Sequence, residues 1–183
     1  MLLFYTVAHD TLTAVVVVDK RGVLHYAGVG HSAPQLVAGA VAAYKHRSQI
    51  TLLKMTESNP EMQHTIDTYM AMVRDPKKID VLNKKIPMYL GGTALQKRVW
   101  TYLVDCTTFR ATTTYGEMAA NLSVPRASRA VAACCAANKI ALAVPCHRVV
   151  SKLGQLTGYR WGVDMKRRLL QREGQSEDTT QTD

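Results

Sequence analysis

The stretch VPCHRVV, residues 144–150, places a cysteine next to a histidine directly after a proline. An ionised cysteine is a nucleophile, and an imidazole is a common base that ionises it. Neighbours along a strand or helix point in different directions, so Cys146 and His147 need a turn or a bridging solvent molecule to act together. Pro145 can supply the turn. The stretch therefore predicts a nucleophilic thiol with a base close to it.

A thiol of this kind needs an orienting group as well as a base. A free cysteine has a pKa of about 8.5, so complete ionisation at neutral pH costs about 2 kcal/mol. His147 can take the Cys146 proton through a water molecule, and Glu173 can orient the imidazole and stabilise its positive form. We therefore predict a nucleophile, base and carboxylate from Cys146, His147 and Glu173.

Positive charge is concentrated in the second half of the chain. The net charge is +9, and residues 93–174 carry 13 Lys and Arg against 4 Asp and Glu. Such an excess attracts a polyanion, and nucleic acid is the leading candidate. A basic surface that serves only solubility is the alternative.

Two short helical patterns, 115–123 and 124–138, are separated by a Ser-Val-Pro turn and favour a helix-turn-helix. Pro125 suits the first turn of the second helix. Arg126 and Arg129 stand near its start, and the turns that follow are almost entirely Ala and Cys, so this helix can approach a groove closely. We expect Arg129 at DNA, because burying it unpaired would be costly. The alternative is packing against another helix, by Ala130, Ala133, Cys134 and Ala137.

The remaining elements follow from periodicity and turn residues. The first half predicts strands at 2–8, 11–19 and 23–29, then helices at 33–47 and 60–75, with Met62, Ile66, Tyr69 and Val73 on one buried face. A domain junction is expected within 76–92. The second half adds a helix after Thr93, an extended run at 140–145 and a lid-like loop at 151–162. The last helix, 163–173, is predicted to bury Met165, Leu169 and Leu170 and to expose Lys166, Arg167 and Arg168.

Composition excludes several classes of protein. The chain has 183 residues, of which 47% are hydrophobic, as in a globular protein. The opening residues contain no basic leader, and the run at 14–18 is too short to span a bilayer, so we expect a protein that is neither exported nor bound to a membrane. The four cysteines form neither a disulfide framework nor a spaced metal motif, which predicts free thiols, no metal and no cofactor.

The motifs PCHRVV, LTGYRWG and KRRLLQRE, preceded by TYGEMA and RAVAACCAANK, resemble the O6-alkylguanine-DNA alkyltransferase family. The resemblance is specific from Thr93 to Glu173. It implies repair of alkylated guanine by self-alkylation at Cys146. It also implies an α+β fold: a ribonuclease-H-like antiparallel sheet with helices in residues 1–88, and a mainly helical, winged helix-turn-helix-like alkyltransferase domain in residues 89–174. Residues 175–183 are expected to be a disordered acidic tail.

The resemblance also implies roles for further residues. Tyr115 would give a proton to the leaving guanine and displace a backbone phosphate, and Asn138 would be the hinge between recognition helix and active site. The base would rotate out of the duplex, and Arg129 would fill its place. The expected DNA contacts are Tyr115, Arg126, Ser128, Arg129 and Ala130. The expected walls of the base pocket are Val144, Val149, Tyr159, Arg160 and Trp161.

One residue departs from the family pattern, and two other functions compete with alkyl transfer. Arg110 stands where the family often has glycine, so the turn before Tyr115 is expected to differ, and the extra cation could touch phosphate. A non-catalytic lesion-sensing DNA binder is the first rival, although the presence of Cys146 argues against it. The second is a cysteine hydrolase, which would turn over repeatedly. A zinc site from adjacent Cys-Cys and Cys-His pairs is disfavoured by geometry.

The expected partner is double-stranded DNA that contains O6-alkylguanine, bound by a monomer. The expected location is the nucleus in a eukaryote and the cytoplasm otherwise.

Overall fold

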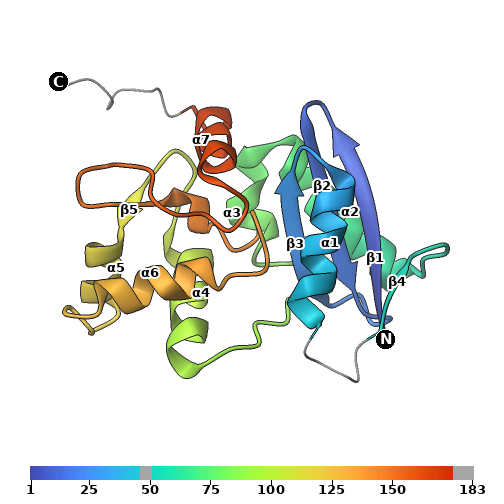
Figure 1. Cartoon of the computed structure of the whole chain (residues 1–183), viewed down its shortest axis with the longest axis horizontal. Helices are drawn as coiled ribbons and strands as arrows, with labels where there is room; N and C mark the ends of the chain where they lie inside the picture. The colour runs from blue at the N-terminus through green and yellow to red at the C-terminus, as the bar shows by residue number, and fades with distance from the viewer. Residues whose placement is uncertain (46–50, 175–183) are drawn as a thin grey trace. The chain divides into compact units, whose positions relative to one another are not determined.

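The computed structural model of the chain describes residues 1–45 and 51–174, and their contacts group into two units (Figure 1). Unit 1 contains Met1–Leu90 and Lys139–Ala143. Unit 2 contains Gly91–Asn138 and the described residues from Val144 onward. The chain therefore leaves unit 2 after Asn138, adds five residues to unit 1, and returns.

Unit 1 is built on a four-stranded sheet in the order β3-β2-β1-β4. The pairs β1–β2 and β2–β3 are antiparallel, whereas β4 runs parallel to β1. The three antiparallel strands confirm the predicted meander. The strands are Leu2–His9 (β1), Leu12–Val18 (β2), Leu24–Gly30 (β3) and Leu52–Lys54 (β4).

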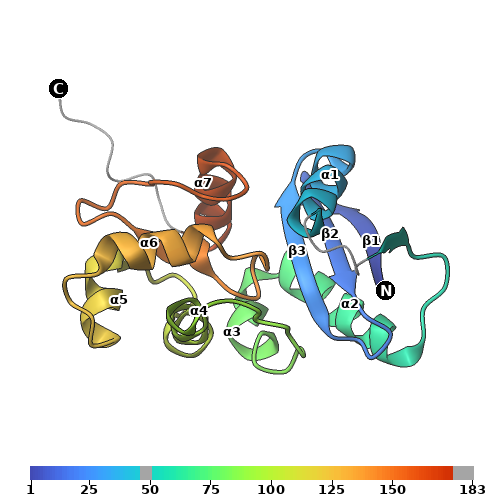
Figure 2. The same ribbon diagram turned by 60° about the horizontal axis from the view of Figure 1, so that its bottom comes forward.

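Two helices cover opposite faces of this sheet, and both ribbon views show this arrangement (Figures 1 and 2). They are α1 (Ala33–Tyr44) and α2 (Pro60–Arg74). Because both faces are covered, the central strand β2 is buried at every residue from Ala14 to Val18, and its sequence is a continuous apolar run rather than an alternating one.

Helix α2 begins and packs as its sequence predicts. The Asn59 side chain accepts a hydrogen bond from the Met62 N–H at 2.9 Å, which caps the helix, and Pro60 occupies the first position. The predicted apolar face is confirmed, because Met62, Ile66, Tyr69 and Val73 are all buried. Beyond this helix, where the sequence shows no sustained period, the chain forms two single turns, η1 (Pro76–Lys78) and α3 (Ile79–Leu82).

The outer edge of β3 is covered by two stretches distant in sequence. The Leu24 N–H donates to the Pro87 carbonyl at 2.8 Å, and the Tyr89 N–H donates to the Leu24 carbonyl at 2.9 Å. Further along, the Ala27 N–H donates to the Lys139 carbonyl at 2.9 Å, and the Ala141 N–H donates to the Ala27 carbonyl at 2.8 Å. Residues 139–143 thus join unit 1 through backbone pairing.

Unit 2 is mainly helical, with one short parallel strand pair, β5–β6. Helices α4 and α5 both pack on α6, and the Trp100 indole N–H donates to the Cys134 carbonyl at 2.8 Å. The elements are α4 (Ala94–Cys106), β5 (Thr113–Thr114), α5 (Tyr115–Asn121), α6 (Ser128–Ala136), η2 (Cys146–Arg148), β6 (Val149–Val150) and α7 (Val163–Arg172).

Capping boxes start two of these helices. Thr93 with Gln96 closes the first turn of α4, and Thr114 with Glu117 closes the first turn of α5. Helix α6 differs from its prediction, because it begins at Ser128 rather than at residue 124. Residues 124–127 form a turn instead, closed by the Ala127 N–H on the Val124 carbonyl at 2.8 Å. Pro125 therefore belongs to this turn and not to the helix.

Candidate active site

Cys146 is the first residue of the single turn η2, which follows Pro145. Every residue from Ala141 to Val150 is buried, and the Cys146 side chain is 4% exposed. Asn138, at the end of α6, is buried as well. Its side-chain amide donates to the Val144 carbonyl at 3.0 Å and to the Cys146 Sγ at 3.1 Å. The end of α6 is therefore tied directly to the sulfur.

The environment of Cys146 keeps its thiol protonated. Burial raises the pKa of the thiol above its ordinary value. The Asn138 hydrogen bond and the positive charges of Lys166 and Arg160 act in the opposite direction but do not offset burial. The thiol therefore needs a base before it can attack.

His147 is placed to be that base. Its Nε2 lies 2.8 Å from Glu173 Oε1, and both side chains are fully buried. Burial lowers the pKa of His147, and the Glu173 carboxylate opposes the lowering only in part, so the imidazole is neutral at pH 7. A proton on Nε2 satisfies the carboxylate and leaves Nδ1 as the acceptor. Nδ1 has no hydrogen-bond partner among residues 1–45 and 51–174.

Arg148 is a further member of this cluster. Its Nε and Nη2 lie 3.1 Å from the two Glu173 carboxylate oxygens, and the whole side chain is buried. Burial alone would raise the pKa of Glu173, but the hydrogen bonds and charges of His147 and Arg148 outweigh burial and lower it. Glu173 is therefore ionised. Sequence reasoning missed Arg148, although it follows Cys146 and His147 within the same motif.

Lys166 contradicts the prediction that it faces solvent, because it is completely buried. It precedes Leu170 by four residues, so both lie on the same face of α7. Its Nζ donates to the Thr157 carbonyl at 3.1 Å and lies 6.0 Å from the centre of the Tyr115 ring. A lysine can bury its aliphatic stem when the ammonium has such a partner. The positive charge of Lys166 thereby acts to lower the pKa of Cys146.

Tyr115, the first residue of α5, is half-buried and faces the 151–162 loop. Its hydroxyl donates to the Thr157 carbonyl at 3.4 Å, the same carbonyl that Lys166 contacts. Burial raises the pKa of Tyr115, so the hydroxyl keeps its proton at neutral pH. The group can therefore serve as a proton donor.

The expected pocket residues fall into two sets. Val144 and Val149 are completely buried on either side of η2. Tyr159 and Trp161 are half-buried in the loop before α7, with their rings edge to face at 5.1 Å. Arg160 between them is exposed, yet its charge lowers the pKa of Cys146.

The expected DNA-binding residues lie on the exposed side of α6 and the turn before it. Arg126, Arg129 and Ala130 are exposed, and Ser128 is half-buried. Ala133 is exposed too, whereas Cys134 faces the core. The alternative of helix packing is therefore correct for Cys134 and wrong for Ala130 and Ala133. Within α6, Arg129 is therefore an exposed long side chain on a face of small residues, where it is accessible to a ligand.

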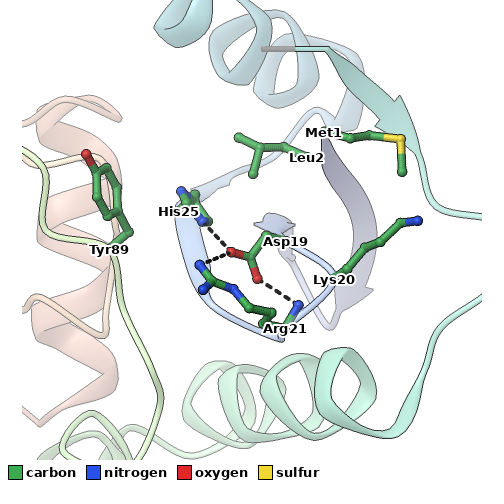
Figure 3. Close-up of a pocket in the computed structure, with 7 residues that line it drawn as sticks. All are labelled: Met1, Leu2, Asp19, Lys20, Arg21, His25 and Tyr89. Carbon is green, nitrogen blue, oxygen red and sulfur yellow. Dashed lines mark hydrogen bonds and ion pairs between the residues drawn. The ribbon is translucent and has the colours of Figure 1, made fainter. Parts of the chain in front are cut away.

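Unit 1 contains a separate hollow around Asp19, between β2 and β3 (Figure 3). His25 Nε2 lies 3.2 Å from the carboxylate, and the backbone N–H groups of Arg21 and Val23 donate to it at 2.9 and 3.0 Å. Burial raises the pKa of Asp19, but these hydrogen bonds outweigh it and lower the pKa. The Tyr89 ring stacks on His25 at 5.0 Å. Asp19 thus closes the turn from β2 to β3.

Within the described ranges, no group of three His, Cys, Asp or Glu side chains is arranged to hold a metal ion. None of the helices in that part of the chain is long and apolar enough to cross a bilayer.

Comparison with known proteins gives a consistent result. Residues 94–175 match the family model for the 6-O-methylguanine DNA methyltransferase DNA-binding domain. The methylated-DNA–protein-cysteine methyltransferase of Debaryomyces hansenii is 38% identical over 174 residues, which cover 93% of this chain and 91% of the relative. The crystal structure of Mycobacterium tuberculosis OGT in complex with DNA superposes with a TM-score of 0.68 at 25% identity, covering 93% and 92% of the two chains. The fold also matches the O6-methylguanine-DNA methyltransferase of Pyrococcus kodakaraensis, with a TM-score of 0.71, 21% identity and coverage of 95% and 99%.

The fold and these relatives define a DNA-binding alkyltransferase of DNA repair. The chain belongs to the methylated-DNA–protein-cysteine methyltransferase family. The family and fold indicated by its sequence motifs are thereby confirmed.

Proposed function

We propose that the protein binds duplex DNA as a monomer, rotates O6-alkylguanine out of the stack, and transfers the alkyl group irreversibly to Cys146. The observation that carries this proposal is the buried His147–Glu173 pair, at 2.8 Å, beside a cysteine whose sulfur accepts a hydrogen bond from Asn138. This arrangement supports a thiol that stays protonated until His147 accepts its proton.

Activation of the thiol moves one proton. The Cys146 proton passes through a water molecule to Nδ1 of His147, which leaves a thiolate and an imidazolium. Glu173 stabilises the imidazolium through Nε2, and its own lowered pKa keeps it charged for this purpose. The Asn138 amide and the Lys166 ammonium stabilise the new negative charge on sulfur.

Transfer then forms one bond and breaks another. The thiolate attacks the alkyl carbon in line, a sulfur–carbon bond forms, and the bond between that carbon and guanine O6 breaks. The electron pair leaves with the guanine, and the Tyr115 hydroxyl donates a proton to the ring. A thioether has no carbonyl carbon for water to attack, so the thiol is not regenerated and each chain acts once.

DNA binding uses the exposed side of α6. The alkylated oxygen is inaccessible within a duplex, so the nucleotide has to leave the stack. Arg129 enters the vacated space, because it is the long side chain on a face of alanines. Arg126 and Ser128 contact the phosphate backbone beside it. The rotated base lies between Val144, Val149 and the 159–161 segment.

The test is incubation with a duplex that carries one radiolabelled O6-methylguanine, followed by peptide mapping. We expect one methyl group per chain, on Cys146, and no further transfer when DNA is in excess. Cys146→Ser should remove the label, whereas Cys106→Ser, which alters an exposed thiol, should retain it. Binding without a gain in mass would favour a lesion sensor. Release of several product molecules per chain would favour a hydrolase. Sedimentation of the protein–DNA complex tests whether the protein binds DNA as a monomer.

A further inference from the structure

Arg110 adopts a backbone conformation that favours glycine. Residues 108–111 form a tight turn, closed by the Ala111 N–H on the Thr108 carbonyl at 3.1 Å. Arg110 is the third residue of this turn and has a φ of +64°. A side chain at such a position is disfavoured, because Cβ crowds the backbone. A residue that carries a side chain there needs a compensating interaction.

Two compensating contacts join Arg110 to Glu173. The Arg110 backbone N–H donates to Glu173 Oε2 at 3.3 Å, and the Arg110 Nε donates to the Glu173 carbonyl at 3.1 Å. One residue therefore holds both the carboxylate and the main chain of the glutamate. The Arg110 guanidinium also lies 5.5 Å from the centre of the Phe109 ring.

The end of α7 is shaped to receive the guanidinium. The helix ends at Arg172, and Gly174 adopts a φ of +79° just beyond it. A Cβ at Gly174 would lie 2.9 Å from Nη2 and 3.0 Å from Nε of Arg110, closer than side chains approach one another. A cation at this position also interacts favourably with the last carbonyl groups of a helix. Gly174 therefore leaves the room that Arg110 occupies.

We propose that Arg110 is a positioning residue, which fixes Glu173 and through it the imidazole of His147. This inference rests on the proposed function of Cys146. Glu173 Oε1 lies 2.8 Å from His147 Nε2, and a hydrogen bond weakens steeply as distance and angle depart from their optimum. Holding the main chain of Glu173 keeps that geometry, and with it the stability of the imidazolium that forms when Cys146 loses its proton.

The decisive variant is Arg110→Gly, because glycine suits the backbone, keeps the N–H that donates to Glu173 Oε2, and removes the side chain that carries the guanidinium. We expect single-turnover methyl transfer at pH 6.5 to slow about three- to tenfold, the effect of losing one hydrogen bond. The defect should shrink as the pH rises toward the raised pKa of the Cys146 thiol, where solvent removes the proton without help from His147. The melting temperature should stay equal or rise. Arg110→Lys, which keeps a donor, should recover part of the rate.

Two further measurements separate positioning from other roles. In a Glu173→Gln background, Arg110→Gly should slow methyl transfer less than it does in the wild type. The carboxylate that Arg110 positions is already absent from that background. Alkylation of Cys146 by iodoacetamide without DNA should show the same pH-dependent defect. Lys152→Ala, which removes an exposed charge from unit 2, is the matched control and should show none.

An equal rate for Arg110→Gly and wild type at every pH would overturn the inference. A defect independent of pH, absent without DNA, would also overturn it and would indicate a phosphate contact. Failure of the wild-type chain to accept methyl groups from DNA would instead refute the proposed function. The iodoacetamide experiment would still report on Arg110 in that event.

Discussion

At the scale of single residues, the cluster behind Cys146 is a set of buried groups whose charges compensate one another. Glu173 is shared between His147 and Arg148, so an always-charged guanidinium and a neutral imidazole contact one carboxylate. Losing one partner of such a cluster leaves a buried charge unpaired, which costs more than the pair contributes. Substitutions here should therefore affect both folding and reactivity.

Acid should destabilise the protein through this cluster. The pKa of Glu173 is lowered in the folded state, so its stabilising contribution is present above the ordinary glutamate pKa of about 4.3 and is lost as pH falls through the lower value. The pKa of His147 is lowered too, so the unfolded chain binds its proton first, and stability falls below about pH 6.5. Urea unfolding from pH 7 to 3 should show both losses. In Glu173→Gln the loss below about pH 4.3 should be smaller; curves that run parallel to the wild type there would contradict this account.

At the scale of elements, the positions of three candidate site residues depend on how helices start and end. Tyr115 is the first residue of α5, Asn138 follows α6, and Glu173 follows α7. A residue at the end of a helix has a helical turn on one side only. Its position therefore depends on the capping hydrogen bonds at that end. Caps are therefore as important to this site as the groups that react.

Removing the α5 cap should disturb Tyr115. Thr114→Ala removes the hydroxyl that accepts the Glu117 N–H at 3.2 Å. A lost N-cap costs about 1 kcal/mol of stability. We expect a lower urea midpoint and slower methyl transfer, because the Tyr115 hydroxyl loses its fixed position. Thr112→Ala, two residues earlier on the exposed surface, is the control and should change neither quantity. Normal transfer by a destabilised Thr114→Ala would show that Tyr115 does not need the cap.

The elements also show what the sequence can and cannot reveal. Periodicity predicted β1–β3 and the buried face of α2 correctly, because apolar spacing follows directly from which face is covered. It failed for Lys166, because its burial depends on the Thr157 carbonyl, nine residues away. It placed the start of α6 too early, because proline is equally common in turns and first helical turns.

Within the candidate site, the motif around Cys146 indicated the residues but not all their contacts. The Asn138 hydrogen bond to sulfur and the Arg148 contacts with Glu173 join residues 8 and 25 positions apart. No local pattern specifies such pairs. The contacts of Arg110 with Glu173 span 63 positions, and no local sequence pattern predicted them either.

At the scale of the whole molecule, the uneven charge should govern the affinity for DNA. Residues 93–174 carry most of the net charge of +9, and neutralising phosphates releases counterions. The logarithm of the binding constant should therefore fall linearly with the logarithm of salt concentration, with a slope of about −0.9 per phosphate contact. We expect Arg126→Ala to reduce this slope by about one contact, as measured by fluorescence anisotropy. Lys20→Ala in unit 1 should leave the slope unchanged; an equal reduction would place phosphate contacts outside the basic unit.

The two stretches that pair with β3 have a consequence for self-association. An open strand edge presents free N–H and carbonyl groups that recruit strands of other molecules and seed aggregates. Here Pro87–Tyr89 and Lys139–Ala141 already engage that edge, while the opposite border is the three-residue strand β4. Under the proposed single-turnover transfer, alkylated copies of the protein accumulate beside unreacted ones. The sheet offers neither form a long open edge on which strands of other molecules could pair.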